Sequence, residues 1–138
     1  MNIDAPQSVS PALLLELFDE PIVFNRCHLR LTGSVTAALF LSYACQLAAE
    51  LDQSLGGWLS LTREEWTQHI GLSRTEQETA RKILREAGVI EERRIGMPAR
   101  LEIKVNTLKL YTRIRAQAAA AYEAAVPSHH SMMIDNHA

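Results

Sequence analysis

The most informative part of the sequence for the fold is residues 58–105, WLSLTREEWTQHIGLSRTEQETARKILREAGVIEERRIGMPARLEIKV. It holds two signals for the start of a helix, T-R-E-E at Thr62–Glu65 and S-R-T-E at Ser73–Glu76. In each, a hydroxyl can cap the helix while a glutamate three residues later reaches back to the capping residue. The two helices predicted from these signals, over residues 63–70 and 74–87, each end at a glycine. Two helices joined by a turn of about three residues predict a helix-turn-helix.

A β-hairpin is predicted directly after the second of these helices. The segments VIEERRI (89–95) and ARLEIKV (99–105) are typical of strands, and Gly96-Met97-Pro98 between them is typical of a tight turn. Arg93, Arg94, Arg100 and Lys104 gather around this hairpin. A hairpin beside a helix-turn-helix commonly follows the phosphate backbone or the minor groove of DNA. The other interpretation of the arginines is solubility and protection of an exposed strand edge.

The helix predicted over residues 74–87 has two distinct faces. Ala80, Ile83, Leu84 and Ala87 recur at helical spacing and are expected to face the core. The opposite face carries long polar and cationic side chains, which reading of the DNA major groove requires. The members of that face, with two flanking residues, are Arg74, Gln77, Glu78, Arg81, Lys82 and Arg85. The alternative is a solvated helix face with internal ion pairs.

These patterns define a predicted DNA-binding set. Arg74, Gln77 and Arg81 are expected to reach base edges, whereas other cations neutralise phosphates. The expected phosphate contacts are Lys82, Arg85, Arg93, Arg94 and Arg100, and Ser73 and Glu78 complete the set.

The remaining sequence surrounds this unit with helical segments. Ser10 and Pro11 are a typical helix start, so a short helix is expected over residues 11–18. Residues 21–33 alternate loosely and are expected to form a strand or an extended arm. The predicted organisation is an N-terminal helix and extended arm (1–32), a winged-helix domain (33–105), a C-terminal helix (106–126) and a flexible tail (127–138).

Two further helices indicate a homodimer. The helix predicted over residues 34–51 is apolar on most sides, with Ser42, Gln46 and Glu50 as one narrow polar stripe. The last helix, capped by Asn106, shows a second apolar pattern at helical spacing. Its members are Leu108, Tyr111, Ile114, Ala118, Ala121 or Tyr122, and Ala125. A domain this small cannot bury both helices completely, so we expect a dimer through one or both of them.

Composition bounds the class of protein. The chain has 138 residues, a net charge of −2 and 47% hydrophobic residues, which exclude disorder throughout and large multidomain enzymes. Charge is uneven: residues 63–115 carry twelve bases and eight acids, whereas residues 1–62 carry two bases and six acids. A basic segment between acidic flanks weakly indicates an anionic partner.

Other features indicate a cytoplasmic protein without enzymatic activity. Cys27 and Cys45 are too few for a disulfide scaffold, and no secretory signal is recognised at the start. The apolar stretch 35–51 is too short and too often interrupted to span a membrane. No catalytic constellation, phosphate-binding loop or cofactor motif is present. The tail histidines His129, His130 and His137 are expected to bind metal only adventitiously.

Four segments carry a resemblance to a known group of proteins. They are G-S-V-T-A-A-L-F-L-S (33–42), L-T-R-E-E-W (61–66), G-L-S-R-T-E-Q-E-T-A-R-K-I-L (71–84) and R-I-G-M-P-A-R (94–100). Over about residues 30–110 the chain resembles the winged-helix domain of phage and plasmid replication proteins, including the N-terminal domain of DnaD-like replication initiators. The resemblance implies a mainly α winged-helix fold, double-stranded DNA as partner and frequent homo-oligomers.

Two functions are carried forward as hypotheses. The first is sequence-specific binding of double-stranded DNA in control of replication or transcription on a phage, plasmid or other mobile element. The second is a non-enzymatic adaptor that binds a replication, transcription or host protein, because winged helices also serve as protein-contact modules. The glutamates among the basic residues and the net charge of −2 favour this second hypothesis.

Overall fold

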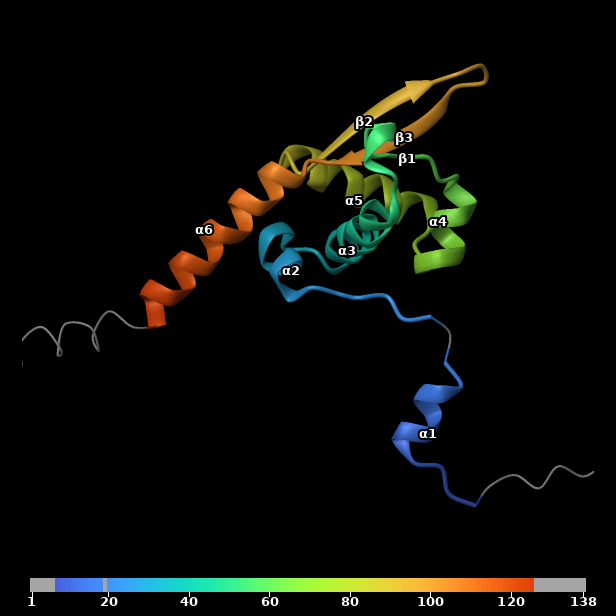
Figure 1. Ribbon diagram of the computed structural model, residues 1–138, viewed down its shortest axis with the longest axis vertical. Coiled ribbons are helices and arrows are strands. Elements are labelled where there is room, and N and C mark those ends of the chain that lie inside the picture. Colours follow the sequence, from blue (N-terminus) through green and yellow to red (C-terminus); the bar gives the residue numbers. More distant parts are fainter. Residues whose placement is uncertain (1–6, 19, 126–138) are drawn as a thin grey trace, which may run out of the picture.

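The computed structural model describes residues 7–18 and 20–125 (Figure 1). It is mainly helical with a small antiparallel sheet, as expected from the sequence. In chain order, the elements are α1 (Pro11–Glu16), α2 (Arg26–Thr32), α3 (Val35–Glu50), the 3-10 turn η1 (Gln53–Leu55), β1 (Trp58–Leu59), α4 (Arg63–Ile70), α5 (Arg74–Glu86), β2 (Ile90–Ile95), β3 (Arg100–Val105) and α6 (Thr107–Ala125).

Helices α4 and α5 form the predicted helix-turn-helix. The Ser73 hydroxyl accepts a hydrogen bond from the Glu76 backbone N–H, and the Glu76 carboxylate accepts one from the Ser73 backbone N–H. The Thr62 hydroxyl caps α4 by accepting from the Glu65 N–H, but no return bond from the Glu65 carboxylate occurs among the described residues. Gly71 ends α4 at a φ of 74°, a left-handed conformation that a side chain would strain. The chain can therefore reverse within the three residues 71–73.

The hairpin β2–β3 follows α5, with β1 added at the free side of β3. The strand order is β1-β3-β2 and both pairings are antiparallel. The register runs from Ile90 opposite Val105 to Ile95 opposite Arg100. Figure 1 shows the hairpin tip projecting beyond the helices, which gives a winged-helix arrangement.

Helix α3 is the centre of the core, as its apolar sequence predicts. Phe40 and Leu41 are completely buried, and the Trp66 ring stacks on Phe40 with centroids 4.2 Å apart. Leu84 of α5 and Ile103 of β3 close the same cluster. Most of helix α3 is thus packed inside one chain, whereas Ala49 near its C-terminus is exposed and Cys45 and Ala48 are only partly buried.

The expectation of a strand or extended arm over residues 21–33 is wrong for its second half, which is helix α2. Gly33 ends this helix at a φ of 65°, and the helix packs along α3. His28 of α2 is buried, with its Nδ1 atom 2.9 Å from the Ser42 hydroxyl. Apolar residues Cys27 and Leu31 are four apart, a spacing that serves one face of a helix as well as one face of a strand. Contact with α3 decides between the two.

The extended part, residues 20–25, accounts for the polar stripe on α3. The Val23 backbone N–H donates to the Gln46 side-chain oxygen at 3.3 Å, and the Asn25 N–H donates to the Ser42 hydroxyl at 3.2 Å. Ser42 and Gln46 of this stripe bind the extended segment, because its backbone N–H groups need hydrogen-bond acceptors.

Helix α6 meets the core through Leu110, which lies outside the apolar pattern predicted for this helix, and through Ile114, which belongs to that pattern. Leu110 is the buried residue and Ile114 is half-buried, whereas Leu108 and Tyr111 are exposed. The Asn106 side chain accepts from the Lys109 N–H, which confirms the expected cap. Leu108 and Tyr111 stay on the exposed side of α6, so the dimer contact expected through this helix stays a prediction. No helix within the described residues is long and apolar enough to cross a membrane.

Candidate nucleic-acid interface

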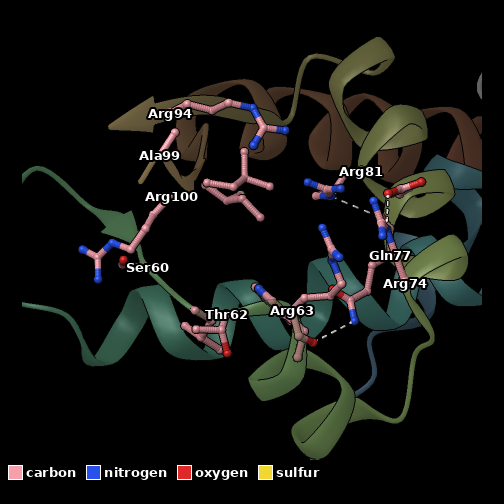
Figure 2. Close-up of a pocket in the computed structure, with 14 residues that line it drawn as sticks. Ser60, Thr62, Arg63, Arg74, Gln77, Arg81, Arg94, Ala99 and Arg100 are labelled. Atoms are coloured by element: carbon pink, nitrogen blue, oxygen red, sulfur yellow. Dashed lines mark hydrogen bonds and ion pairs between the residues drawn. The ribbon is translucent and has the colours of Figure 1, made fainter. Parts of the chain in front are cut away.

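A cavity of about 270 Å³ lies between the start of α4, the exposed side of α5 and the hairpin (Figure 2). Its lining consists of Ser60, Leu61, Thr62, Arg63, Trp66, Arg74, Gln77, Glu78, Arg81, Arg94, Ala99, Arg100, Leu101 and Ile103. Three parts of the chain that are separate in sequence thus contribute to one concave surface.

The cavity is strongly cationic. Five of its lining residues are arginines and one, Glu78, is a carboxylate. Glu78 pairs with Arg74 at 3.1 Å, and both side chains are largely exposed. Arg63, Arg94 and Arg100 form no ion pair within the described residues. The field inside the cavity therefore attracts anions, and low-dielectric walls strengthen such a field.

Arg81 is the deepest of the cations. Its side chain is only 14% exposed, and its Nη1 atom lies 3.9 Å from the Glu92 carboxylate, which is already paired with Arg85 at 2.8 Å. Burial lowers the pKa of the Arg81 guanidinium, and neighbouring Arg85 and Arg94 lower it further against the opposing effect of Glu92. An arginine stays charged at neutral pH even so. An anion entering the cavity would offset the cost of holding this charge away from water.

Gln77 was expected to reach a base edge, but its side chain is buried, with 4% exposed. The amide nitrogen donates toward the Arg63 carbonyl oxygen at 3.1 Å, the Thr67 hydroxyl at 3.0 Å and the Leu72 carbonyl oxygen at 3.0 Å. It links α5 to α4 and to the turn between them. The spacing contained a signal, because Gln77 lies three residues before Ala80 and seven before Leu84, on the core face of the helix.

The cations of the hairpin do not form the single group that the sequence suggested. Arg93 and Arg94 are adjacent in a strand and point to opposite faces of the sheet. Arg94 lines the cavity, whereas Arg93 pairs with Glu102 at 2.8 Å and lies over the Trp58 ring at 4.2 Å. Figure 2 shows the Arg94 guanidinium directed toward Arg81 and that of Arg100 directed away.

The other predicted residues remain at the surface of α5. Ser73 is exposed, with its hydroxyl engaged in the cap, and Arg85 is held by Glu92. Lys82 is exposed and forms no ion pair among the described residues. The exposed side of α5 thus presents Arg74 and Glu78 in the cavity lining and Lys82 outside it.

Arg63 is the residue that sequence reasoning missed. It is the first residue of α4, directly after the Thr62 cap. Its position at a helix start next to the second helix was visible in the sequence, but its neighbours in the cavity come from α5 and the hairpin. Only the packing of α4 against α5 brings them together.

The tail histidines His129, His130 and His137 lie outside the described residues. Within residues 7–18 and 20–125, no three histidine, cysteine or carboxylate side chains are grouped to hold a metal ion. Comparison of the chain with protein-family models, with curated proteins and with solved structures gave no match.

Proposed function

We propose that the chain binds double-stranded DNA with the exposed side of α5 and the β2–β3 hairpin. The observation that carries this proposal is the convergence of Arg63, Arg81 and Arg94, from α4, α5 and the hairpin, on one cavity. An α-helix fits the major groove of DNA, and a neighbouring hairpin can then contact the adjoining phosphates. The arrangement suits a strand of DNA that passes over the cavity.

The geometry suggests a division of roles on this surface. Arg74, Glu78 and Lys82 are exposed on α5 and suit contacts with base edges or the groove wall. Arg63, Arg81 and Arg94 surround the cavity and suit a backbone phosphate, which accepts bidentate hydrogen bonds from guanidinium groups. Arg81 thus moves from the base-reading group of the sequence analysis to the phosphate-binding group, because it is half-buried.

The proposal includes a role in control of replication or transcription on a mobile element. It rests here on the motif resemblance, which supplies the biological context for DNA binding. Selection from a random duplex library tests it. Enrichment of an inverted repeat supports a site-specific regulator or initiator. Binding without an enriched sequence supports an architectural role based on phosphate contacts.

A protein-binding adaptor is the second candidate, and a specific observation favours it. The cations Arg74, Arg85 and Arg93 are each satisfied by a glutamate of the same chain. A surface that neutralises its own charges attracts phosphate less strongly than the number of arginines implies. An adaptor would show no salt-dependent affinity for DNA.

Fluorescence anisotropy with a labelled duplex distinguishes the two. Arg94→Ala is the test variant, and Arg93→Ala is the matched control because it removes the neighbouring arginine from the opposite face of the hairpin. We expect Arg94→Ala to weaken binding roughly tenfold and to reduce the salt slope by about one, the change expected for one lost phosphate contact. Arg93→Ala is expected to change affinity by less than about threefold, since its guanidinium is engaged by Glu102.

Two outcomes would refute the assignment. Absence of duplex binding at low salt would refute the DNA-binding function and favour the protein-binding adaptor. Equal loss of affinity in both variants would mean that the cavity is not the phosphate site. Thermal unfolding of each variant separates a local effect from a loss of folded protein.

A further inference from the structure

Helix α1 is an apolar helix that is not buried by any other part of the chain that the structure describes. Its side chains are all exposed, including Leu13, Leu14 and, just beyond its end, Leu17 and Phe18, which share one face. Leu17 is 76% exposed and Phe18 62%. Figure 1 shows α1 standing apart from the other helices. A helix this short is not stable in water by itself, because isolated helices below about 12–15 residues are marginal.

An apolar groove lies elsewhere on the molecule, between α3 and α6. Its volume is about 560 Å³. It is lined by Cys45, Ala48, Ala49, Gln53, Gly56, Gly57, Lys104, Val105, Thr107, Leu110, Tyr111 and Ile114. Alanines and glycines on one side leave it open, and Tyr111 on the other is 63% exposed. Small side chains opposite an exposed aromatic ring suit the insertion of leucine or phenylalanine side chains.

The α1 helix cannot reach this groove on its own chain. Glu20, Pro21 and Ile22 lie against Tyr43 and Glu50 of α3. At 3.6 residues per turn, that side of α3 is opposite to the side that carries Cys45, Ala48 and Ala49. The four residue steps from Glu16 to Glu20 span at most about 14 Å, little more than the diameter of one helix. While the arm stays seated on α3, α1 is held on the wrong side of the molecule for its own groove.

Charge also matches α1 to the groove. Among the described residues 7–18 and 20–25, the charged side chains are Glu16 and Glu20. The groove carries Lys104, and exposed Arg115 follows the groove residue Ile114 on α6. Residues 103–122 contain no acidic residue. Glu16 of α1 and Lys104 of the groove carry opposite charges and attract each other, whereas two α1 helices or two grooves would not.

We propose that α1 of one chain docks into the α3–α6 groove of a second copy, and that the reciprocal contact forms a two-fold dimer. Each copy then supplies one helix and one groove, as a closed symmetric interface requires. The proposal is independent of DNA binding, because the groove shares no lining residue with the arginine cavity. It also places the dimer contact at α6 and away from the buried α3 core.

The oligomeric state of the full chain tests this proposal. Light scattering after size exclusion should give twice the chain mass of 15.4 kDa at about 100 µM, since dimer populations follow protein concentration. The double variant Leu14→Glu/Leu17→Glu should be monomeric, or at least tenfold weaker in dimerisation. Its matched control, Ala12→Glu/Leu15→Glu, adds the same charge to the other side of α1 and should remain dimeric.

The groove is tested separately by filling it. Ala49→Trp should weaken the dimer at least tenfold, whereas Ala119→Trp, on the exposed end of α6, should not. Both alanines are exposed, so the folded chain tolerates either change, and circular dichroism verifies this.

Cross-linking identifies which copy fills the groove. In a Cys27→Ala/Cys45→Ala background, Leu17→Cys and Ala49→Cys joined by a short bismaleimide should give a covalent dimer on a denaturing gel. A monomeric wild type at about 100 µM would overturn the proposal. So would a dimer that survives both Leu14→Glu/Leu17→Glu and Ala49→Trp, or a cross-link formed within one chain.

Discussion

Replacement of Gln77 distinguishes a structural glutamine from a DNA-reading one. A base-contacting side chain would lower DNA affinity when removed and leave stability unchanged. The structure predicts the reverse, because the Gln77 amide is buried between α4, α5 and the turn. Gln77→Ala is therefore expected to reduce the free energy of unfolding.

The magnitude follows from the contacts. An amide group has two N–H donors, so two of the three acceptors around Nε2 are fully bonded at one time. Two such bonds contribute about 2 kcal/mol net, and loss of a buried methylene adds about 0.8 kcal/mol. We expect Gln77→Ala to lower the free energy of unfolding by about 2–3 kcal/mol. Gln77→Glu should lower it further, since a carboxylate would face acceptors only.

Urea unfolding followed by tryptophan fluorescence measures the effect, since the side chain of Trp66 on α4 is buried and stacked on Phe40. Gln68→Ala is the matched control, because Gln68 is an exposed glutamine of α4. Its replacement should change stability by less than about 0.5 kcal/mol. A Gln77→Ala variant as stable as the wild type, with weaker DNA binding, would refute the reasoning.

Three further predictions concern the core. Phe40→Ala should cost about 3–5 kcal/mol in urea unfolding, because it removes a fully buried ring stacked on Trp66; a loss below about 1 kcal/mol would contradict the packing. Burial lowers the pKa of His28 from 6.5, so as pH falls below 6.5 the unfolded chain takes up a proton that the native chain resists, and stability should decrease. His28→Asn should flatten the unfolding free energy between about pH 7 and pH 5, and an unchanged slope would assign the effect to other groups. Burial raises the pKa of Cys45 to about 11, so at pH 8 only about one thiol in a thousand is the reactive thiolate. Iodoacetamide should modify Cys45 slowly in the native chain and readily in urea, as peptide mass spectrometry would show; equally rapid modification would mean that the thiol is accessible.

Local chemistry was enough to predict most helices and the hairpin. Ser10 with Pro11, and Ser73 with Glu76, start helices where the structure has them, because a cap bonds to N–H groups only three residues away. Gly71 ends α4 because a glycine, which has no side chain, adopts the left-handed conformation without strain. These interactions join residues only a few positions apart, so they can be recognised from the sequence alone.

Part of the candidate site was also present in the sequence as periodicity. Strand alternation already separates Arg93 from Arg94, and helical spacing already places Gln77 on the core face of α5. The types of the side chains pointed the other way, since arginines near a hairpin tip suggest a single cationic cluster and a glutamine suggests an exposed position. Residue spacing was the better guide than polarity at these positions.

Most helices and the β2–β3 hairpin could be located from the sequence, since their limits depend on caps, turns and periods within a few residues. Only the tertiary structure decided that residues 26–32 are helical, that Leu110 is the α6 residue facing the core, and that Arg63 joins Arg81 and Arg94 at one cavity. Each of these depends on contacts between segments far apart in the chain. Such contacts are selected by the shape of the buried surface, which local sequence does not encode.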